Sequence, residues 1–395
     1  MSAQFSTIVP GRAATPAAWG GVLALSLGAF VLVASEFMPV SLLTPIATDL
    51  RISEGQAGQA IAVSGAFALV TSLAISSLAG KVDRKLLLAA LTLLMIVSGT
   101  IAAFAPNYPM FMLGRAFIGV AIGGFWSMSA ATAMRLVPLE KVPKALAIVN
   151  GGNALATVVA APLGSYLGAI IGWRGAFFCL IPVAAVALAW KLASLPAMPP
   201  AGQGRGGSIF ALLKQPAVAL GMVASSLFFM GQFTLFTYLR PFLETVTRVD
   251  ASMLSLLLLG VGVAGFVGTT LIGGVLKGGL YRTLVAIPLL LAAIAVALPV
   301  FGASMPVVAV LLALWGLLAT SAPVGWWTWV ARTLPHDAEA GGGLLVAIVQ
   351  LAIALGATVG GLLFDGFGYR ATFGTAAVIF VAAAVLALLA SRHDN

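Results

Sequence analysis

Charged side chains are scarce in this chain of 395 residues, and their scarcity excludes an ordinary water-soluble protein. Only 8% of the residues are Asp, Glu, Lys or Arg, whereas about 25% is usual in soluble domains. Hydrophobic residues make up 61%. Several apolar runs exceed the ~18 residues that a helix needs to cross a bilayer. The sequence therefore predicts an all-α polytopic membrane protein.

Cysteine and histidine are also rare. Cys179 is the single cysteine, so no intrachain disulfide can form. The two histidines, His336 and His393, lie in polar stretches, and no Ser-His-Asp, metal-ligand or P-loop pattern accompanies them. We therefore predict no enzymatic activity, no metal and no cofactor. Without a nucleotide-binding motif, any transport would draw its energy from an ion or substrate gradient.

Charged and Pro/Gly-rich breaks divide the chain into twelve apolar spans. In hydrocarbon, every backbone N–H and C=O must be bonded within the segment, so each span is predicted to be a helix. The spans are residues 20–46, 55–79, 86–104, 109–134, 142–169, 174–193, 216–242, 251–276, 283–301, 306–331, 338–364 and 370–390. The longest break, 194–215, is rich in Pro and Gly and predicts a flexible linker. The expected organisation is a tail (1–19), a six-helix bundle (20–193), the linker, a second bundle (216–390) and a tail (391–395).

The distribution of Lys and Arg predicts the orientation of the chain. If the N-terminus is cytoplasmic, the inner segments hold 14 Lys and Arg residues, Lys191 among them, and the outer loops hold 5. Cytoplasmic loops normally carry this excess, so both termini and the linker are expected inside. The same excess explains the net charge of +9 without a nucleic-acid partner.

The two halves look duplicated. An offset of 196 residues places Glu36-Phe37 on Gln232-Phe233 and Gly172 on Gly368, and similar offsets relate residues in other spans. We therefore predict two pseudo-symmetric six-helix bundles. A parallel repeat about an axis along the membrane normal places a substrate site near mid-membrane, between the halves.

Two ionisable residues lie inside the spans of the first half. Glu36 is ~16 Å from the outer end of its span, and Arg115 is ~9 Å from the outer face. A charge at the bilayer centre costs about 2.5–3.5 kcal/mol, so both should face an interior cavity or a partner. Glu36 is either a proton-binding site or one end of a permanent salt bridge to Arg115. Arg115 either responds to the charge of Glu36 or hydrogen-bonds carbonyls near the outer interface.

The second half keeps hydrogen-bonding groups at the matching positions but no charge. Gln232 stands at the position of Glu36, and Asn153 is related to Gln350 by the repeat. Amides both donate and accept hydrogen bonds, which suits a neutral polar solute. Trp126, ~12 Å from the inner end of its span, and Phe236 are candidates to stack on a planar ligand. Packing or contact with lipid is the alternative for each aromatic side chain.

Three motifs resemble those of the major facilitator superfamily over essentially the whole chain. The loop "GKVDRKLLL" keeps Asp83 and Arg84 of the first loop motif but lacks its second glycine and paired arginines. "GRAFIGVAIGG" is similar to the motif whose arginine, here Arg115, the family associates with proton coupling. "AAPLGSYLG" resembles the antiporter motif, with Pro162 retained. The resemblance implies the major facilitator fold, with conformational gating by Asp83, Arg84 and Pro162.

Longer strings resemble the drug:proton antiporters that export purine ribonucleosides. These strings are "EFMPVSLLTPIATDLRISEGQAGQ", "GGFWSMSAATAMRLVP", "AAPLGSYLG", "GQFTLFTYLRP" and "PVGWWTWVARTL". The resemblance implies a monomer in a bacterial inner membrane that exports nucleosides such as inosine and guanosine in exchange for protons. Glu36 would carry the proton with Arg115 as partner. The residues expected to line the substrate site are Trp126, Asn153, Gln232, Phe236 and Gln350.

Two alternatives to nucleoside export stay open. The first keeps the proton-antiport mechanism but changes the substrate to a sugar or a drug. The second is a transporter-like receptor that binds a solute and signals without net flux.

Overall fold

The structure, a computed structural model, describes residues 17–79, 82–199, 209–334 and 338–393. Within these ranges the chain is almost wholly helical and contains no β-strand. Several predicted features lie outside the described residues. They are most of the N-terminal tail (1–16), the loop-motif residues 80–81, the middle of the linker (200–208) and the last two residues.

The first half contains six α-helices and a short 3-10 turn. They are α1 (Trp19–Ser41), α2 (Leu43–Leu50), α3 (Glu54–Ala79), α4 (Arg84–Phe104), α5 (Tyr108–Leu136), η1 (Leu139–Lys141) and α6 (Val142–Ser194). The second half follows the linker. Its elements are η2 (Ile209–Lys214), α7 (Pro216–Phe236), α8 (Leu239–Phe242), the short π-helix η3 (Leu243–Thr247), α9 (Ala251–Lys277), α10 (Leu280–Phe301), α11 (Met305–Thr333) and α12 (Ala338–His393).

Two of the long helices each hold two membrane spans. Ten described helices are long and apolar enough to cross a membrane, and α6 and α12 among them have 53 and 56 residues. Each bends sharply at a glycine, Gly172 (φ 76°, ψ 163°) or Gly368 (φ 78°, ψ 179°). Only glycine adopts these angles readily. Each bend adds one span, and the prediction of twelve transmembrane helices is confirmed.

The backbone repeats its special features at the offset seen in the sequence. The bends at Gly172 and Gly368 are 196 residues apart. Arg51 and Arg248, 197 residues apart, both adopt left-handed angles (φ 55° and 59°) just before a long helix. The predicted duplication is therefore present in the local conformation of the two halves as well as in their residue types.

Polar side chains start several of the helices. Asn107 caps α5 by accepting a hydrogen bond from the Met110 amide at 3.1 Å, and Asp250 caps α9 in the same way through Met253 at 2.7 Å. Such caps satisfy amide groups that have no partner within the helix. The apolar interiors of the helices need no further signal, because the bilayer offers the backbone no other partner.

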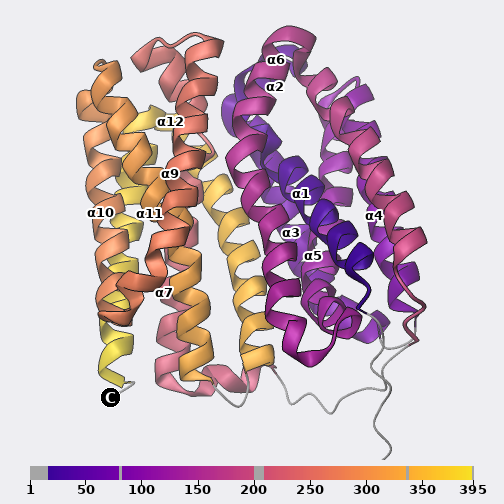
Figure 1. Cartoon of the computed structure of the whole chain (residues 1–395). Helices are drawn as coiled ribbons and strands as arrows, with labels where there is room; N and C mark the ends of the chain where they lie inside the picture. Colours follow the sequence, from indigo (N-terminus) through magenta and orange to yellow (C-terminus); the bar gives the residue numbers. More distant parts are fainter. Residues whose placement is uncertain (1–16, 80–81, 200–208, 335–337, 394–395) are drawn as a thin grey trace, which may run out of the picture.

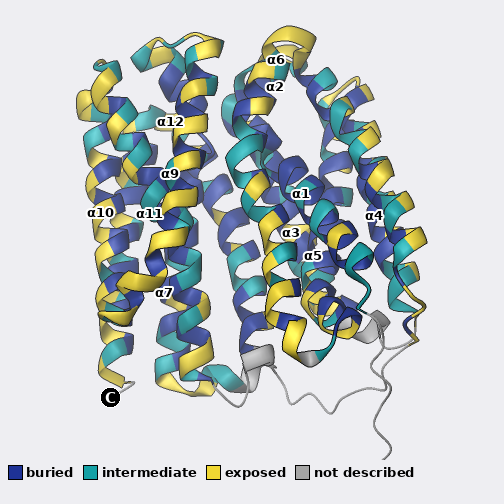
Figure 2. Cartoon of the chain, in the orientation of Figure 1, coloured by how far each residue is buried: buried dark blue, intermediate teal, exposed yellow. Residues whose placement is uncertain are grey.

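The helices form two bundles that stand side by side (Figure 1). The helices α1 to α6 form one bundle, and α7 to α12 form the other. They meet where α12 packs against α3 and where α6 packs against α9. Buried residues line the inside of each bundle, while exposed residues follow its outer faces (Figure 2). Many of those exposed residues are large and apolar, such as Leu86, Val300 and Val378, as expected of surfaces that face lipid.

Candidate functional site

A pair of repeat-related phenylalanines, near the C-terminal ends of α1 and α7, joins the two bundles. Phe37 of α1 stacks on Phe233 of α7, with ring centroids 5.6 Å apart and planes inclined by 21°. Each ring directly follows one of the predicted polar site residues, Glu36 or Gln232. The structure therefore brings the two equivalent segments together at the bundle boundary, where the duplication predicted a site.

The Glu36 carboxyl is buried at this boundary, with 3% of the residue exposed. The side chain of Gln350 on α12, in the opposite bundle, lies close enough to this carboxyl to interact with it. Two of the predicted site residues, one from each bundle, are thus neighbours at the boundary.

Arg115 of α5 is bound to backbone rather than to the Glu36 carboxylate. Its guanidinium donates to the carbonyls of Ala60 (3.0 Å), Ser35 (2.8 Å) and Glu36 (2.9 Å), and to the Ser64 hydroxyl (3.1 Å). Among the described residues no ion pair joins Arg115 to the carboxylate. The structure shows the carbonyl-binding alternative, at a buried position, and not the permanent salt bridge.

In this arrangement Arg115 makes contacts that hold helices together, and these contacts are separate from those of the Glu36 carboxyl. Arg115 holds α1 and α3 against α5 through the carbonyl oxygens of Ser35 and Glu36 on α1 and of Ala60 on α3. The carboxyl itself contacts a neutral amide. A buried carboxyl with a neutral partner can take up and release a proton without breaking an ion pair. The roles of Glu36 and Arg115 in proton coupling remain predictions.

Two amide oxygens at the boundary can each accept a further hydrogen bond. The Oε1 atoms of Gln232 and Gln350 are buried and accept no hydrogen bond from any described residue. Buried polar atoms are nearly always hydrogen-bonded, and exceptions call for an explanation. These two oxygens are acceptors suited to the N–H or O–H groups of a polar solute.

The other predicted lining residues are placed less distinctively. Trp126 is half-buried and packs edge-on against Phe125 (5.5 Å, 82°). Phe236 is half-buried against the core of the second bundle, and Asn153 is half-buried on α6. In the part of the chain that is described, no hydrogen bond or ring contact joins these three to Glu36. Their contact with a substrate remains a prediction.

The predicted gating residues Asp83 and Arg84 organise the end of the first bundle that the predicted topology places inside. The Asp83 carboxylate caps α4 by accepting from the Lys85 amide, and it also accepts from the Met198 amide, both at 2.8 Å. The Arg84 amide donates to the Met198 carbonyl at 3.1 Å. This motif ties the start of α4 to the chain that leaves α6. Pro162 is buried within α6. Gating by these residues is still a prediction.

A polar contact between the bundles was not predicted from the sequence. Asp365 of α12 accepts hydrogen bonds from the Gly55 amide (2.9 Å) and from the Ser53 hydroxyl. The second bundle thereby caps the start of α3 in the first. One helical turn further on, Thr358 donates to the Gln59 side chain at 3.1 Å. A Cβ at Gly55 would collide with Asp365, so the contact requires glycine there. We call Ser53, Gly55 and Asp365 the outer latch.

Two further residues join the bundles near the outer latch. The Tyr238 hydroxyl donates to the Ala357 carbonyl at 2.7 Å and lies 3.5 Å from the Gly55 carbonyl. Arg240 donates to the Ser41 carbonyl. In the predicted topology all these residues lie toward the outer surface. Throughout the described ranges, the side-chain hydrogen bonds between the bundles lie at this end, which the predicted topology places outside, and they hold the two bundles together there.

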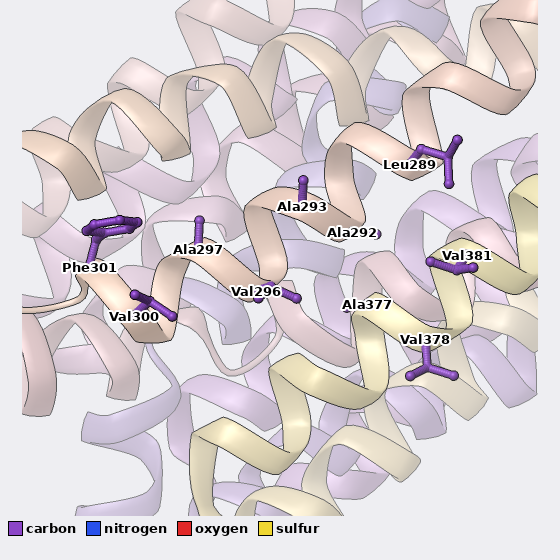
Figure 3. Close-up of a pocket in the computed structure, with 10 residues that line it drawn as sticks. All are labelled: Leu289, Ala292, Ala293, Val296, Ala297, Val300, Phe301, Ala377, Val378 and Val381. Carbon is purple, nitrogen blue, oxygen red and sulfur yellow. The ribbon is translucent and has the colours of Figure 1, made fainter.

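The bundle surface also carries an apolar groove that is not part of this site. It runs between α10 and the last part of α12, and its labelled side chains are pure hydrocarbon (Figure 3). Val296, Val300 and Val378 line it and are among the exposed hydrophobic residues. A groove of this kind faces lipid tails and offers no polar group to a solute.

Comparisons with known proteins agree with this geometry. The model of the Major Facilitator Superfamily matches residues 25–342. The chain is 65% identical over 378 residues to a Pseudomonas aeruginosa protein named transcription regulatory protein OpdE, covering 95% of this chain and 94% of that protein. It is 43% identical over 350 residues to the purine ribonucleoside efflux pump NepI of Salmonella paratyphi B, covering 89% and 88%.

Solved structures share the fold at low sequence identity. A bacterial homologue of the human lysosomal transporter Spinster, in an inward-facing and unoccupied conformation, matches with a TM-score of 0.79 and 16% identity over 96% of this chain and 98% of that one. A D-xylose-proton symporter matches with a TM-score of 0.74 and 17% identity over 93% and 97%. These likenesses establish the two-bundle architecture.

Proposed function

Because this chain belongs to the major facilitator superfamily, whose members are membrane transporters, we propose that it exports purine ribonucleosides in exchange for protons. The observation that carries the proposal is the 43% identity, over 89% of the chain, to a protein named as a purine ribonucleoside efflux pump. The substrates are nucleosides of the inosine and guanosine type. The chain acts as a monomer in a bacterial inner membrane, with both termini in the cytoplasm.

Glu36 is the proton carrier in this proposal. It is the single acidic residue within α1, α4, α5 and α6, and its carboxyl is buried against the neutral Gln350 amide. Burial disfavours the ionised form, so the proton exchanges when the boundary between the bundles opens to water. Because Gln350 belongs to the opposite bundle, the charge of Glu36 acts on the contact that must change during transport.

Amide and aromatic groups bind the substrate. A purine base presents N–H groups at its edge, and the ribose adds hydroxyls. The unused oxygens of Gln232 and Gln350 can accept hydrogen bonds from these donors. Trp126 and Phe236 offer ring faces for the flat base, and Asn153 adds a further amide.

The proposed cycle starts from the closed outer end. In this conformation the substrate enters from the cytoplasm, and the outer latch with Tyr238 and Arg240 keeps the outside shut. Protonation of Glu36 from the outside and release of the proton inside would drive the alternation between the two states. Asp83, Arg84 and Pro162 shape the inner end, which must close when the outer end opens.

The test uses inverted membrane vesicles with an imposed pH gradient. We expect labelled inosine and guanosine to accumulate inside, and to leak out when an uncoupler removes the gradient. Competition with arabinose and with a lipophilic cation separates nucleoside export from sugar or drug export. Accumulation that ignores the pH gradient would refute proton coupling, and displacement by arabinose alone would favour a sugar substrate.

A second candidate function is regulation without net flux. One observation favours it: the relative that is 65% identical is named a transcription regulatory protein. A regulator of this kind would bind the solute at the same boundary and signal through a change of conformation. Binding of inosine to the purified protein without any flux in vesicles would support this candidate.

A further inference from the structure

The first bundle encloses a lysine that the proposed cycle does not use. Lys191 of α6 is fully buried, although its place near the end of a span suggested an inner cytoplasmic position. Its Nζ atom donates to the Thr92 hydroxyl of α4 at 2.8 Å and lies 5.1 Å from the ring centroid of Phe125 on α5. It also fills the space beside Gly28 of α1, where a Cβ would collide with it.

The amine lies deep in the bundle. Thr92 is eight residues from the inner start of α4, or ~12 Å along the helix axis. Gly28 is nine residues from the start of α1, or ~14 Å. The side chain of Lys191 therefore extends from the inner end of α6 toward the middle of the membrane rather than to the cytoplasmic surface.

The surroundings match an amine with two N–H donors rather than three. The described residues offer Nζ one hydrogen-bond acceptor, the Thr92 oxygen, and one ring face. The Thr92 hydroxyl hydrogen is already donated to the Leu88 carbonyl at 2.8 Å. An ammonium group carries three donors, and burying one without a counter-charge is very costly. One acceptor and one ring face do not replace a counter-charge, so this packing favours the neutral amine.

No described acid neutralises Lys191. Glu36 is the single carboxyl on the four helices around it, and it lies eight residues from Gly28, or ~12 Å along α1. The ion pairs of the described chain, Arg174–Asp49 and Arg240–Glu244, do not include Lys191. The other titratable residues of these helices are Arg84, Lys85, Tyr108, Arg115, Arg135, Lys144, Tyr166, Arg174 and Cys179.

We propose that Lys191 is a second proton-binding group of the first bundle, separate from Glu36. It is neutral in the packing described here. It binds a proton when α1, α4 and α6 move enough to give it a third acceptor or water. Proton uptake at Lys191 then favours that second packing. The proposal adds a pH response to the proposed transport cycle, but proton binding by Lys191 is measurable without any transport.

The first test is the pH dependence of thermal unfolding of the purified protein. In the unfolded chain Lys191 is protonated below pH ~10, so unfolding takes up about one proton more than it would without Lys191. We expect the unfolding midpoint of the wild type to rise with pH between 6 and 9 more steeply than that of Lys191→Met. Lys144→Met removes the same charge from an exposed position of α6 and should follow the wild-type slope. Equal slopes for wild type and Lys191→Met would overturn the proposal.

The second test compares permanent charge with permanent neutrality. Lys191→Arg cannot become neutral, so we expect at least a tenfold loss of folded protein or of transport. Lys191→Met, or Lys191→Gln if the first is poorly recovered, should fold and keep nucleoside export with a flattened pH profile. The proposal fails if Arg replaces Lys without effect, or if both neutral variants fail to fold while Arg succeeds. Should the wild type show no export, the unfolding titration still decides the role of Lys191.

Discussion

At the scale of single residues, the position of one guanidinium decides what Glu36 can do. The Arg115 guanidinium donates hydrogen bonds to carbonyl oxygens of α1 and α3 and to the Ser64 hydroxyl. Had it formed an ion pair with the carboxylate, losing one partner would have left an uncompensated buried charge. Instead Glu36 contacts the neutral Gln350. Glu36 can therefore bind and release a proton while the hydrogen bonds of Arg115 hold α1 and α3 against α5.

Replacing Glu36 by Gln should uncouple transport from the proton. Glu36→Gln keeps the size and a hydrogen-bonding group beside Gln350 but cannot ionise. We expect accumulation of inosine against its gradient to fall at least tenfold in inverted vesicles, while exchange of labelled for unlabelled inosine continues. Gln232→Glu provides the mirror-image control, because it adds a carboxyl at the equivalent position. Uphill accumulation by Glu36→Gln at the wild-type rate would show that the proton is carried elsewhere.

Removing Arg115 should weaken the fold more than it would as a surface residue. Arg115→Leu removes a donor from three buried helical carbonyls, and that of Ser35 has no helical partner, because Pro39 four residues on lacks an N–H; leaving it unsatisfied costs about 1–3 kcal/mol. We expect a loss of stability of at least about 2 kcal/mol, measured as a lower unfolding midpoint in detergent. Arg135→Leu, at the exposed end of the same helix, is the matched control. Equal midpoints for the two variants would mean that the carbonyl contacts contribute little.

The sequence predicted polar positions within the spans, but it did not predict what those side chains touch. The repeat identified Glu36, Gln232 and Gln350 as equivalent or polar positions inside spans. It could not show that Gln350 reaches Glu36, because an offset relates positions within the halves and not contacts between them. Lys191 was placed at the cytoplasmic side because distance from a span end says nothing about the direction of a side chain.

At the scale of helices, the structure explains why Gly172 and Gly368 divide the predicted spans. The sequence predicted separate spans on either side of each glycine, and in the structure the glycine is the non-helical residue at which one span ends and the next begins. Both glycines have positive φ with ψ near 180°, a region that is essentially closed to other residues.

Alanine at either bend should therefore destabilise the protein through backbone strain alone. No neighbour lies within 4 Å of a Cβ built at Gly172 or Gly368, so no steric clash contributes. We expect Gly172→Ala and Gly368→Ala each to cost about 1–3 kcal/mol, seen as lower unfolding midpoints. Gly366→Ala has the same open space without the positive φ and should be nearly neutral. A similar loss at Gly366 would contradict the strain argument.

The outer latch makes a prediction about the balance between conformations. Asp365→Ala removes the acceptor that caps α3 from the other bundle, so the outward-open state should become more populated. Spin labels at Pro106 and Ala303, exposed outer positions of the two bundles, report this as longer distances in a Cys179→Ser background.

Glu54→Gln is the control for the outer latch. It removes an acid from the same end of α3 without touching Asp365, and it should leave the distance distribution as in the wild type. An unchanged distribution in Asp365→Ala would mean that Tyr238 and Arg240 keep the outer end closed by themselves.

At the scale of the whole molecule, composition and the internal repeat predicted the architecture. They did not predict hydrogen bonds between residues that are distant in the sequence. Twelve spans and two bundles follow from apolar length and from the requirement that backbone groups bond internally. The outer latch joins Gly55 to Asp365, 310 positions apart, and no local pattern marks either residue. The signal available there was only an acid near the outer end of a span.

The most direct test of the central claim is a flux measurement on the purified protein in liposomes. The proposed function predicts that liposomes containing it accumulate labelled inosine above the external concentration when the lumen is acidic relative to the medium, with the cytoplasmic face outward. Accumulation should vanish when the gradient is collapsed and should be lost in Glu36→Gln. Inosine binding to the same preparation without any gradient-dependent accumulation would contradict export and would place this chain with regulators that bind but do not transport.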